Sequence, residues 1–138
     1  MNEQEFKEAL GGEKAEKREH KDLIVDKKLP CEVTFHHGDQ VYKGTSMHFN
    51  ERGMLVMSKR PAPLNARGKL ILQFPGFKNL IELQGEVVWT NIYGPGDSLS
   101  PKGMAIKYMN AEREQERLFT DLAEQYESLG SIYSCYYT

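Results

Sequence analysis

The sequence is poor in cysteine, in tryptophan and in long apolar runs. Its two cysteines, Cys31 and Cys135, lie far apart and belong to no Cys-x-x-Cys or Cys/His cluster. This argues against structural zinc and a disulfide-built scaffold, so we expect two free thiols. No apolar run approaches the roughly 20 residues that a membrane-spanning helix needs. The first residues also lack a secretory signal pattern, so we expect a cytoplasmic protein without membrane insertion.

Net charge is also small. The 138 residues carry −2 at pH 7, and 28% of them are charged against 39% hydrophobic, which is typical of one folded globular domain. Such a charge gives no general attraction to nucleic acid, so we expect no nucleic-acid partner. The charge is uneven: residues 29–110 carry nine Lys and Arg against six Asp and Glu, and residues 111–129 carry two against six. An anionic ligand should therefore prefer the middle of the chain.

Recognisable catalytic and metal-binding motifs are missing as well. The sequence contains no Gly-x-Ser-x-Gly, His-Glu-x-x-His, P-loop or Gly-x-Gly-x-x-Gly pattern. His36 and His37 are adjacent and His48 follows, but neighbouring residues of a strand point to opposite faces and make a poor metal site. We therefore expect no catalytic residues, no metal and no bound cofactor.

What is present is a series of short strand patterns bounded by turn residues, which is typical of antiparallel β proteins. Strands are predicted over residues 31–36, 41–48, 54–57, 69–74, 80–92 and 103–109. The alternation is clearest in 80–92, where Val87 and Trp89 share the apolar face. Helical spacing in residues 111–129 predicts an amphipathic helix that ends at Gly130. These elements favour an all-β fold, a six-stranded antiparallel barrel with a C-terminal α-helix, since closure removes exposed edges.

The two ends of the chain differ in composition from the barrel region. Residues 1–22 alternate in charge and hold few apolar residues, so we predict a mobile charged arm. Residues 23–129 then form the barrel and its helix. Residues 130–138 carry three tyrosines and no charged side chain, which predicts docking on their own domain or on a partner, including a second copy in a homodimer.

Four patches of sequence are more informative together than any one of them alone. They are Leu29-Pro30-Cys31-Glu32-Val33, His48-Phe49-Asn50-Glu51-Arg52-Gly53, Gly85-Glu86-Val87-Val88-Trp89 and Gly103-Met104-Ala105-Ile106-Lys107-Tyr108-Met109. In this order, and with a helix after the last, the chain resembles the PilZ family over roughly residues 20–128. The resemblance implies a bacterial module that binds the second messenger cyclic di-GMP, or that contacts proteins in motility, pili and biofilm signalling.

The family's ligand site has two parts, which the resemblance places on this sequence. The first is Arg-x-x-x-Arg before the first strand, where this chain has His20 and Ile24. The second is Asp/Asn-x-Ser-x-x-Gly at the second turn, where this chain has His48, Asn50 and Gly53. Arginine offers phosphate a planar two-pronged donor and guanine a flat face, so its loss should weaken nucleotide binding strongly.

Other basic residues offer a substitute for the missing arginines. The candidate ligand-binding residues are Lys17, Arg18, Lys21, His48, Asn50, Arg52 and Gly53. Positive charges predicted to gather around one end of the barrel are Arg52, Lys59, Arg60, Arg67 and Lys69. This cluster is either a solvated basic loop or a surface for an anion or an acidic partner. Trp89 is expected in the core, or else at a rim where it stacks on a purine.

Two functions follow, and a third class, an enzyme on a small barrel, has no supporting motif. The leading hypothesis is a non-catalytic adaptor that contacts an unidentified protein in a motility or signalling complex, with weak or no binding of cyclic di-GMP. The alternative is a genuine cyclic di-GMP receptor that uses the basic arm and Arg52 as a non-standard site. We favour the adaptor because several oriented, charge-assisted contacts are lost.

Overall fold

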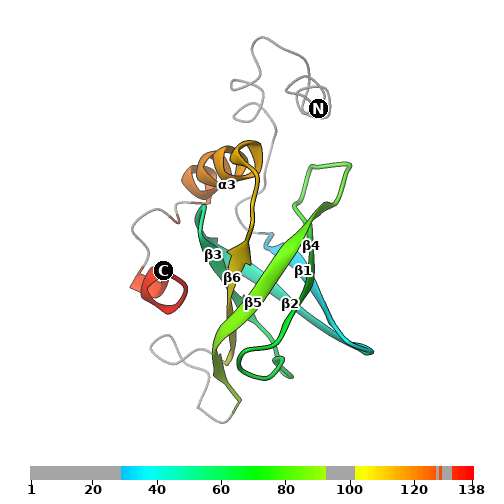
Figure 1. Cartoon of the computed structure of the whole chain (residues 1–138). Helices are drawn as coiled ribbons and strands as arrows, with labels where there is room; N and C mark the ends of the chain where they lie inside the picture. The colour runs from blue at the N-terminus through cyan, green and yellow to red at the C-terminus, as the bar shows by residue number, and fades with distance from the viewer. Residues whose placement is uncertain (1–28, 93–101, 127, 129–131) are drawn as a thin grey trace.

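The structure is a computed structural model that describes residues 29–92, 102–126, 128 and 132–138 (Figure 1). The predicted N-terminal arm and its Lys17, Arg18 and Lys21 lie outside the described residues, as does the predicted helix end at Gly130. None of the helices described has the length and apolar character needed to cross a membrane.

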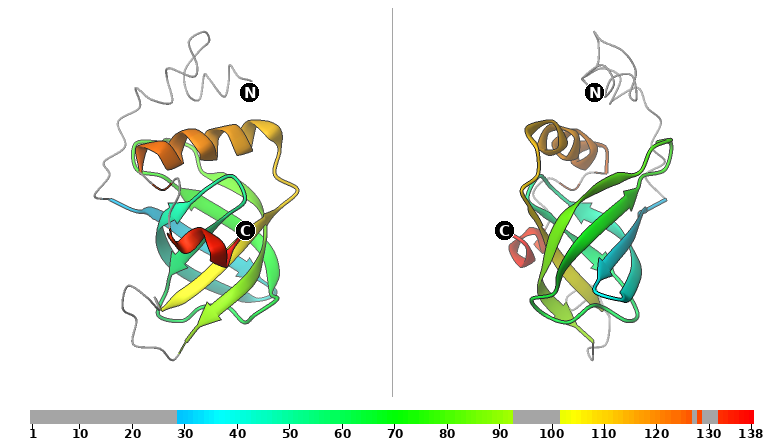
Figure 2. Two further views of the ribbon diagram at one scale, coloured as in Figure 1. Left: turned by 90° about the vertical axis from the view of Figure 1, so that its left-hand side faces the viewer. Right: turned by 45° about the vertical axis from the view of Figure 1, so that its right-hand side comes forward.

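Antiparallel strands form a closed barrel, as predicted. The strands are β1 (Cys31–His37), β2 (Gln40–Phe49), β3 (Gly53–Met57), β4 (Arg67–Gln73), β5 (Ile81–Asn91) and β6 (Gly103–Met109). Their order around the barrel is β1-β2-β3-β6-β5-β4, and the pairing of β1 with β4 closes the ring (Figure 2). Several strand ends differ from the predicted ones by one or two residues, because backbone pairing rather than side-chain alternation sets them.

Side chains alternate between the two faces of the barrel wall. In β1 the buried residues Cys31, Val33 and Phe35 point inward, and the exposed Glu32 between them points to solvent. The β1–β2 hairpin turns at Gly38, whose φ of 60° is a left-handed conformation that glycine adopts without a side-chain clash. This short turn fixes the register of the hairpin and therefore which side chains of β2 face the core.

Helix α3 (Arg113–Gln125) lies across one end of the barrel in all three views of Figures 1 and 2. It begins with a capping box in which Glu112 and Gln115 satisfy free backbone donors of the first turn. The predicted range of 111–129 was too long, because apolar spacing continues beyond the helix itself. Tyr126 already caps the helix, and its hydroxyl donates a hydrogen bond to the Leu29 carbonyl at 3.1 Å.

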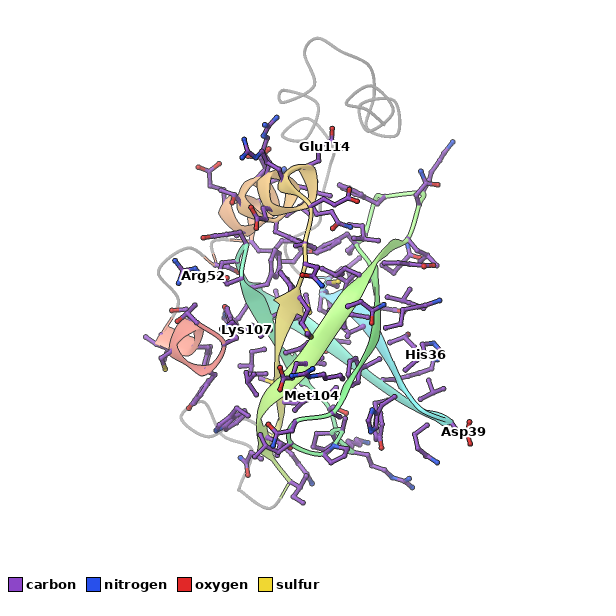
Figure 3. The ribbon with its side chains drawn as sticks, viewed as in Figure 1. His36, Asp39, Arg52, Met104, Lys107 and Glu114 are labelled. Carbon is purple, nitrogen blue, oxygen red and sulfur yellow. The ribbon has the colours of Figure 1, made fainter. Side chains whose placement is uncertain are left out.

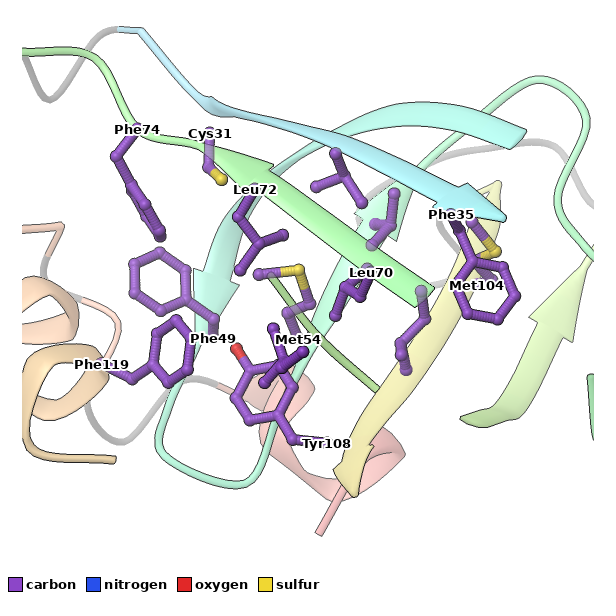
Figure 4. Close-up of a cluster of buried hydrophobic side chains, with 14 of the residues drawn as sticks. Cys31, Phe35, Phe49, Met54, Leu70, Leu72, Phe74, Met104, Tyr108 and Phe119 are labelled. Atoms are coloured by element: carbon purple, nitrogen blue, oxygen red, sulfur yellow. The ribbon is translucent and has the colours of Figure 1, made fainter. Parts of the chain in front are cut away.

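The buried face of α3 packs on an aromatic cluster that fills this end of the barrel. Phe119 stacks on Tyr108 with ring centroids 4.6 Å apart. Phe49 meets Phe74 and Tyr126 edge to face at 5.4 and 5.3 Å (Figure 4). Edge-to-face and offset ring pairs add to the stability that comes from burial alone. The helix is therefore the cover of the barrel core at this end.

A bulge in β5 changes the face that Trp89 occupies. Val87 pairs with Ile106 and is buried in the core, but the register shifts before Trp89, which pairs with Ala105. Since side chains alternate along a strand, the extra residue turns Trp89 to the outer wall. The prediction that Trp89 lies in the barrel core is therefore wrong: it is half-buried on the outside. Val87 is buried, as expected from its place on the apolar face.

Residues 132–138, here called the C-terminal segment, cover part of the outer wall. The segment contains the short helix η1 (Ile132–Tyr136), which contacts β2 and β3. Tyr137, Leu55 of β3 and Ala105 of β6 form a second buried cluster outside the barrel. The tyrosine-rich end thus docks on its own domain, which was one of the two possibilities left open by the sequence.

The two cysteines should differ in reactivity. Cys31 is fully buried in β1 and burial raises the pKa of its thiol, whereas Cys135 is exposed on η1. Because the thiolate is the reactive form, a maleimide should modify native Cys135 quickly and Cys31 only after unfolding. Intact-mass spectrometry should show a single adduct in buffer and two in denaturant, and Cys135→Ser should abolish the native adduct. Two adducts under native conditions would mean that β1 is not held in the barrel.

Candidate functional site

The candidate site is the β2–β3 turn, residues 50–52, with the adjoining ends of both strands. The side-chain Oδ1 of Asn50 accepts hydrogen bonds from the backbone N–H of Arg52 at 2.8 Å and of Gly53 at 3.3 Å. The N–H of Asn50 donates to the Gly53 carbonyl at 2.9 Å. Asparagine commonly shapes turns in this way. The amide oxygen of Asn50 is therefore engaged in holding the backbone of the turn.

Gly53 lies where β3, β6 and the C-terminal segment approach one another closely. A Cβ placed on Gly53 would lie 2.5 Å from the carbonyl oxygen of Ile106 and 2.9 Å from the Cβ of Tyr137. Carbon atoms do not approach that closely without a shift, so the fold itself requires glycine here. The space beside this glycine is filled by Tyr137 of the same chain.

His48 also faces the C-terminal segment. Its half-buried ring lies with its centroid 4.6 Å from that of Tyr133, at an interplanar angle of 61°. Burial lowers the pKa of His48 below its ordinary value, which favours the neutral imidazole. The position where the family carries an acidic or amide residue is thus occupied by an uncharged ring packed against tyrosine.

The contacts continue from His48 as a row of aromatic rings across the outer wall. The ring centroids of Tyr133 and Tyr136 are 6.3 Å apart. Tyr136 in turn stacks on Trp89 of β5, with ring centroids 4.4 Å apart. The row runs from β2 to β5 and crosses the outside of β3 and β6. The C-terminal segment therefore covers the wall next to the turn (Figures 1 and 3).

Arg52 is the basic residue of the turn. Its side chain is 62% exposed and its Nε lies 3.9 Å from a carboxylate oxygen of Glu51, a loose surface pair. Its backbone carbonyl accepts a hydrogen bond from the N–H of Tyr108 at 2.9 Å, which anchors the turn on β6. In Figure 3 Arg52 and His36 lie on opposite sides of the barrel. The backbone of Arg52 is thus anchored by a hydrogen bond, whereas its side chain is exposed to solvent.

The predicted gathering of Arg52 with four other basic residues is wrong. Arg52 precedes β3 while Lys59 and Arg60 follow it, so they lie at opposite ends of that strand. Loops at the two ends of one strand lie at opposite ends of the barrel. Arg67 and Lys69 are on β4, where they pair across to Glu86 at 3.6 Å and Glu82 at 3.9 Å on β5.

The structure brings four of the seven candidate residues together at the turn: His48, Asn50, Arg52 and Gly53. The others lie outside the described residues, as do the positions of the family arginines: Lys17, Arg18, Lys21, His20 and Ile24. Tyr133 and Tyr137 are also neighbours of this turn, although the sequence alone did not predict it. The signal was available in β3, where Leu55 is apolar on the face opposite the core and so requires a cover.

Within the part of the chain that the structure describes, no group of three or more His, Cys, Asp or Glu is arranged to hold a metal ion. The groups at the turn are an amide engaged in the backbone, a neutral imidazole and one exposed guanidinium. Such groups support binding, and the guanidinium is the one that attracts an anion.

Docking of the C-terminal segment can be tested at Tyr137. Its side chain is 1% exposed, burial raises its pKa to about 12, and its hydroxyl has no hydrogen-bond partner among the described residues. Tyr137→Ala should lower the free energy of unfolding by about 3 kcal/mol, as for other buried aromatics. Tyr137→Phe removes only the unpaired hydroxyl. Its free energy of unfolding should therefore be within about 1 kcal/mol of the wild-type value, or higher than it. Urea denaturation measures both, and an Ala variant as stable as wild type would contradict docking.

Comparison with known families agrees with this architecture. The sequence profile of the PilZ domain matches residues 15–125, which is most of the chain. No curated protein matches the sequence. The matched range takes in the described strands and α3. From this match and the closed six-stranded barrel with its C-terminal helix, the chain belongs to the PilZ domain family, whose members are modules of cyclic di-GMP-related signalling.

Proposed function

We propose that this chain is a non-catalytic cytoplasmic adaptor in cyclic di-GMP-linked regulation of motility, pili or biofilm. It acts by contacting another protein and binds the nucleotide weakly or not at all. One observation carries the proposal: the chain's own C-terminal segment covers the wall beside the β2–β3 turn. Tyr133 packs on His48 there, and Tyr137 fills the space beside Gly53.

A nucleotide that approached Gly53 would have to displace Tyr137. That displacement would expose Leu55 and Ala105, which are buried beneath the segment. Burying a large aromatic side chain contributes on the order of 2 kcal/mol or more, and this contribution would be subtracted from the free energy of binding. The covered wall therefore opposes nucleotide binding.

The turn also offers few charge-assisted contacts to a phosphate. Asn50 uses its amide oxygen within the turn, and His48 is held in its neutral form. Each charge-assisted hydrogen bond contributes roughly 1.5 to 3 kcal/mol, and about 1.4 kcal/mol corresponds to a tenfold change in affinity. Losing two such contacts weakens binding by on the order of a hundredfold or more.

A second candidate function is favoured by Arg52 alone. Its guanidinium is exposed and only loosely paired with Glu51, so it remains available to an anion. In this alternative the chain is a cyclic di-GMP receptor with a non-standard site, in which Arg52 acts with Lys17, Arg18 and Lys21. Binding of this kind would rest largely on solvent-exposed charge and would be sensitive to salt.

Calorimetric titration with cyclic di-GMP separates the two functions. The wild-type chain should bind with a Kd above about 10 μM or give no heat, because oriented contacts are missing and the wall is covered. Any residual binding should weaken steeply with added salt, and Arg52→Ala should remove it. A sub-micromolar affinity that survives about 0.5 M salt would overturn the adaptor role in favour of the receptor.

Restoring the family's motif gives a second test, in which the C-terminal segment itself is varied. The variant His20→Arg, Ile24→Arg, His48→Asp, Asn50→Ser should gain affinity for cyclic di-GMP by at least about tenfold when residues 132–138 are also deleted. With the segment intact the gain should be much smaller, because Tyr137 still fills the space beside Gly53. Circular dichroism should confirm that both variants are folded. An equal gain with the segment in place would show that it does not block the site.

A further inference from the structure

β2 extends well beyond its neighbour β3. β2 pairs with β1 from Ser46 to Gln40, at the turn of the hairpin, but it pairs with β3 only between Thr45 and Phe49. β3 ends at Met57, opposite Thr45, and the chain then leads into the loop that contains Pro61. Among the described residues, no strand therefore lies beside residues 40–44 of β2 on the β3 side.

The hairpin register shows which backbone groups face this open side. His37 pairs with Gln40 across the two-residue turn, so alternate residues, Gln40, Tyr42 and Gly44, direct their N–H and C=O groups to β1. Val41 and Lys43 direct theirs away from β1. The Lys43 carbonyl accepts a hydrogen bond from the Ser58 hydroxyl at 2.8 Å. The N–H and C=O of Val41 and the N–H of Lys43 remain along the open edge.

A groove of about 690 Å³ surrounds this edge. Its lining includes Glu32, Val41, Lys43, Met57, Lys59 and Arg60. Val41 is 50% and Met57 39% exposed, so the floor carries apolar surface. The lining holds three cationic side chains, Lys43, Lys59 and Arg60, and one anionic side chain, Glu32. None of the three cations forms a salt bridge with another described residue.

We propose that this edge groove binds an extended acidic segment of a partner protein, which pairs with β2 along residues 40–44 and continues the sheet where β3 stops. The edge is about 13 Å long, enough for a strand of four or five residues. Main-chain hydrogen bonds to Val41 and Lys43 would fix the register of the partner strand on β2. The carboxylates of that strand would form ion pairs with Lys59 and Arg60. The proposal rests on the adaptor role proposed above and names its binding surface.

Charge argues for a foreign partner over a second copy of this chain. Pairing of two β2 edges would bring the Lys43, Lys59 and Arg60 of one copy close to those of the other. Like charges brought together across an interface oppose association. An acidic strand instead neutralises the groove, so charge complementarity selects the occupant.

The full chain can be tested with a synthetic probe, the capped peptide Glu-Val-Glu-Val-Glu-Val-Glu. Titration into the ¹⁵N-labelled protein should shift the amide resonances of residues 40–44 and 58–60 and slow hydrogen exchange at Val41 and Lys43. The peptide Lys-Val-Lys-Val-Lys-Val-Lys, of the same length and opposite charge, should leave them unchanged. Absence of any shift with the acidic peptide, or shifts centred on α3 or η1, would overturn the proposal.

A matched pair of variants isolates the main-chain contribution. Val41→Pro removes the outward N–H without breaking the β1–β2 ladder, because that N–H does not point to β1. It should weaken binding of the acidic peptide at least about tenfold, while Val41→Thr keeps the N–H and should stay within about twofold of wild type. If Val41→Pro binds as well as wild type, strand pairing is refuted.

Charge reversal isolates the electrostatic contribution. Lys59→Glu with Arg60→Glu should weaken binding of the acidic peptide at least about tenfold and permit binding of the lysine peptide. If both peptides bind this variant as they bind wild type, the cations do not select the occupant. Sedimentation measures whether a second copy occupies the edge. If wild type is a dimer and Val41→Pro is a monomer, the edge binds a second copy and the proposal of an acidic partner is overturned.

These results are independent of the nucleotide titration. A tight cyclic di-GMP complex would refute the adaptor role and leave the peptide shifts at β2 unchanged. If the acidic peptide shifts no amide resonances, the groove is not a peptide-binding site, and the expected weak affinity for cyclic di-GMP is unaffected.

Discussion

The pairing of β3 with β6 puts apolar side chains on both faces of the barrel wall, and the arrangement of the molecule follows from covering both. Met54 and Val56 of β3 point into the core, while Leu55 between them points outward beside Ala105. A strand that is apolar on both faces needs cover on both. The inner face is covered by the barrel core, and the outer face by the C-terminal segment through Tyr137.

That outer cover determines which surfaces remain free for binding. It lies next to the β2–β3 turn, so the wall around His48 and Gly53 is already in contact with tyrosines. At the other end of β2 the strand projects past β3 and its edge stays open. The same strand is thus covered near one end by its own chain, while near the other end its edge on the β3 side has no partner strand among the described residues.

Much of the fold could be predicted from the sequence, because alternation and turn residues are local signals. The position of Trp89 could not, since Val87, Val88 and Trp89 are all apolar and a one-residue bulge among them leaves no trace in the pattern. The open edge of β2 was also hidden, because it depends on the unequal lengths of paired strands. At the site, the turn and Gly53 could be predicted from the sequence. The packing of Tyr137 on Gly53 could not, because it joins residues that are distant in sequence.

The C-terminal segment is attached in a different way from every strand of the barrel. Among the described residues, no backbone hydrogen bond joins it to the wall; its own bonds are internal, from the N–H groups of Tyr137 and Thr138 to the Ser134 carbonyl. Its release therefore breaks side-chain packing and leaves the ladders intact. Local opening of this kind costs less free energy than global unfolding. Release of the segment would thus expose Leu55 and Trp89 while the strand pairing of the barrel is kept.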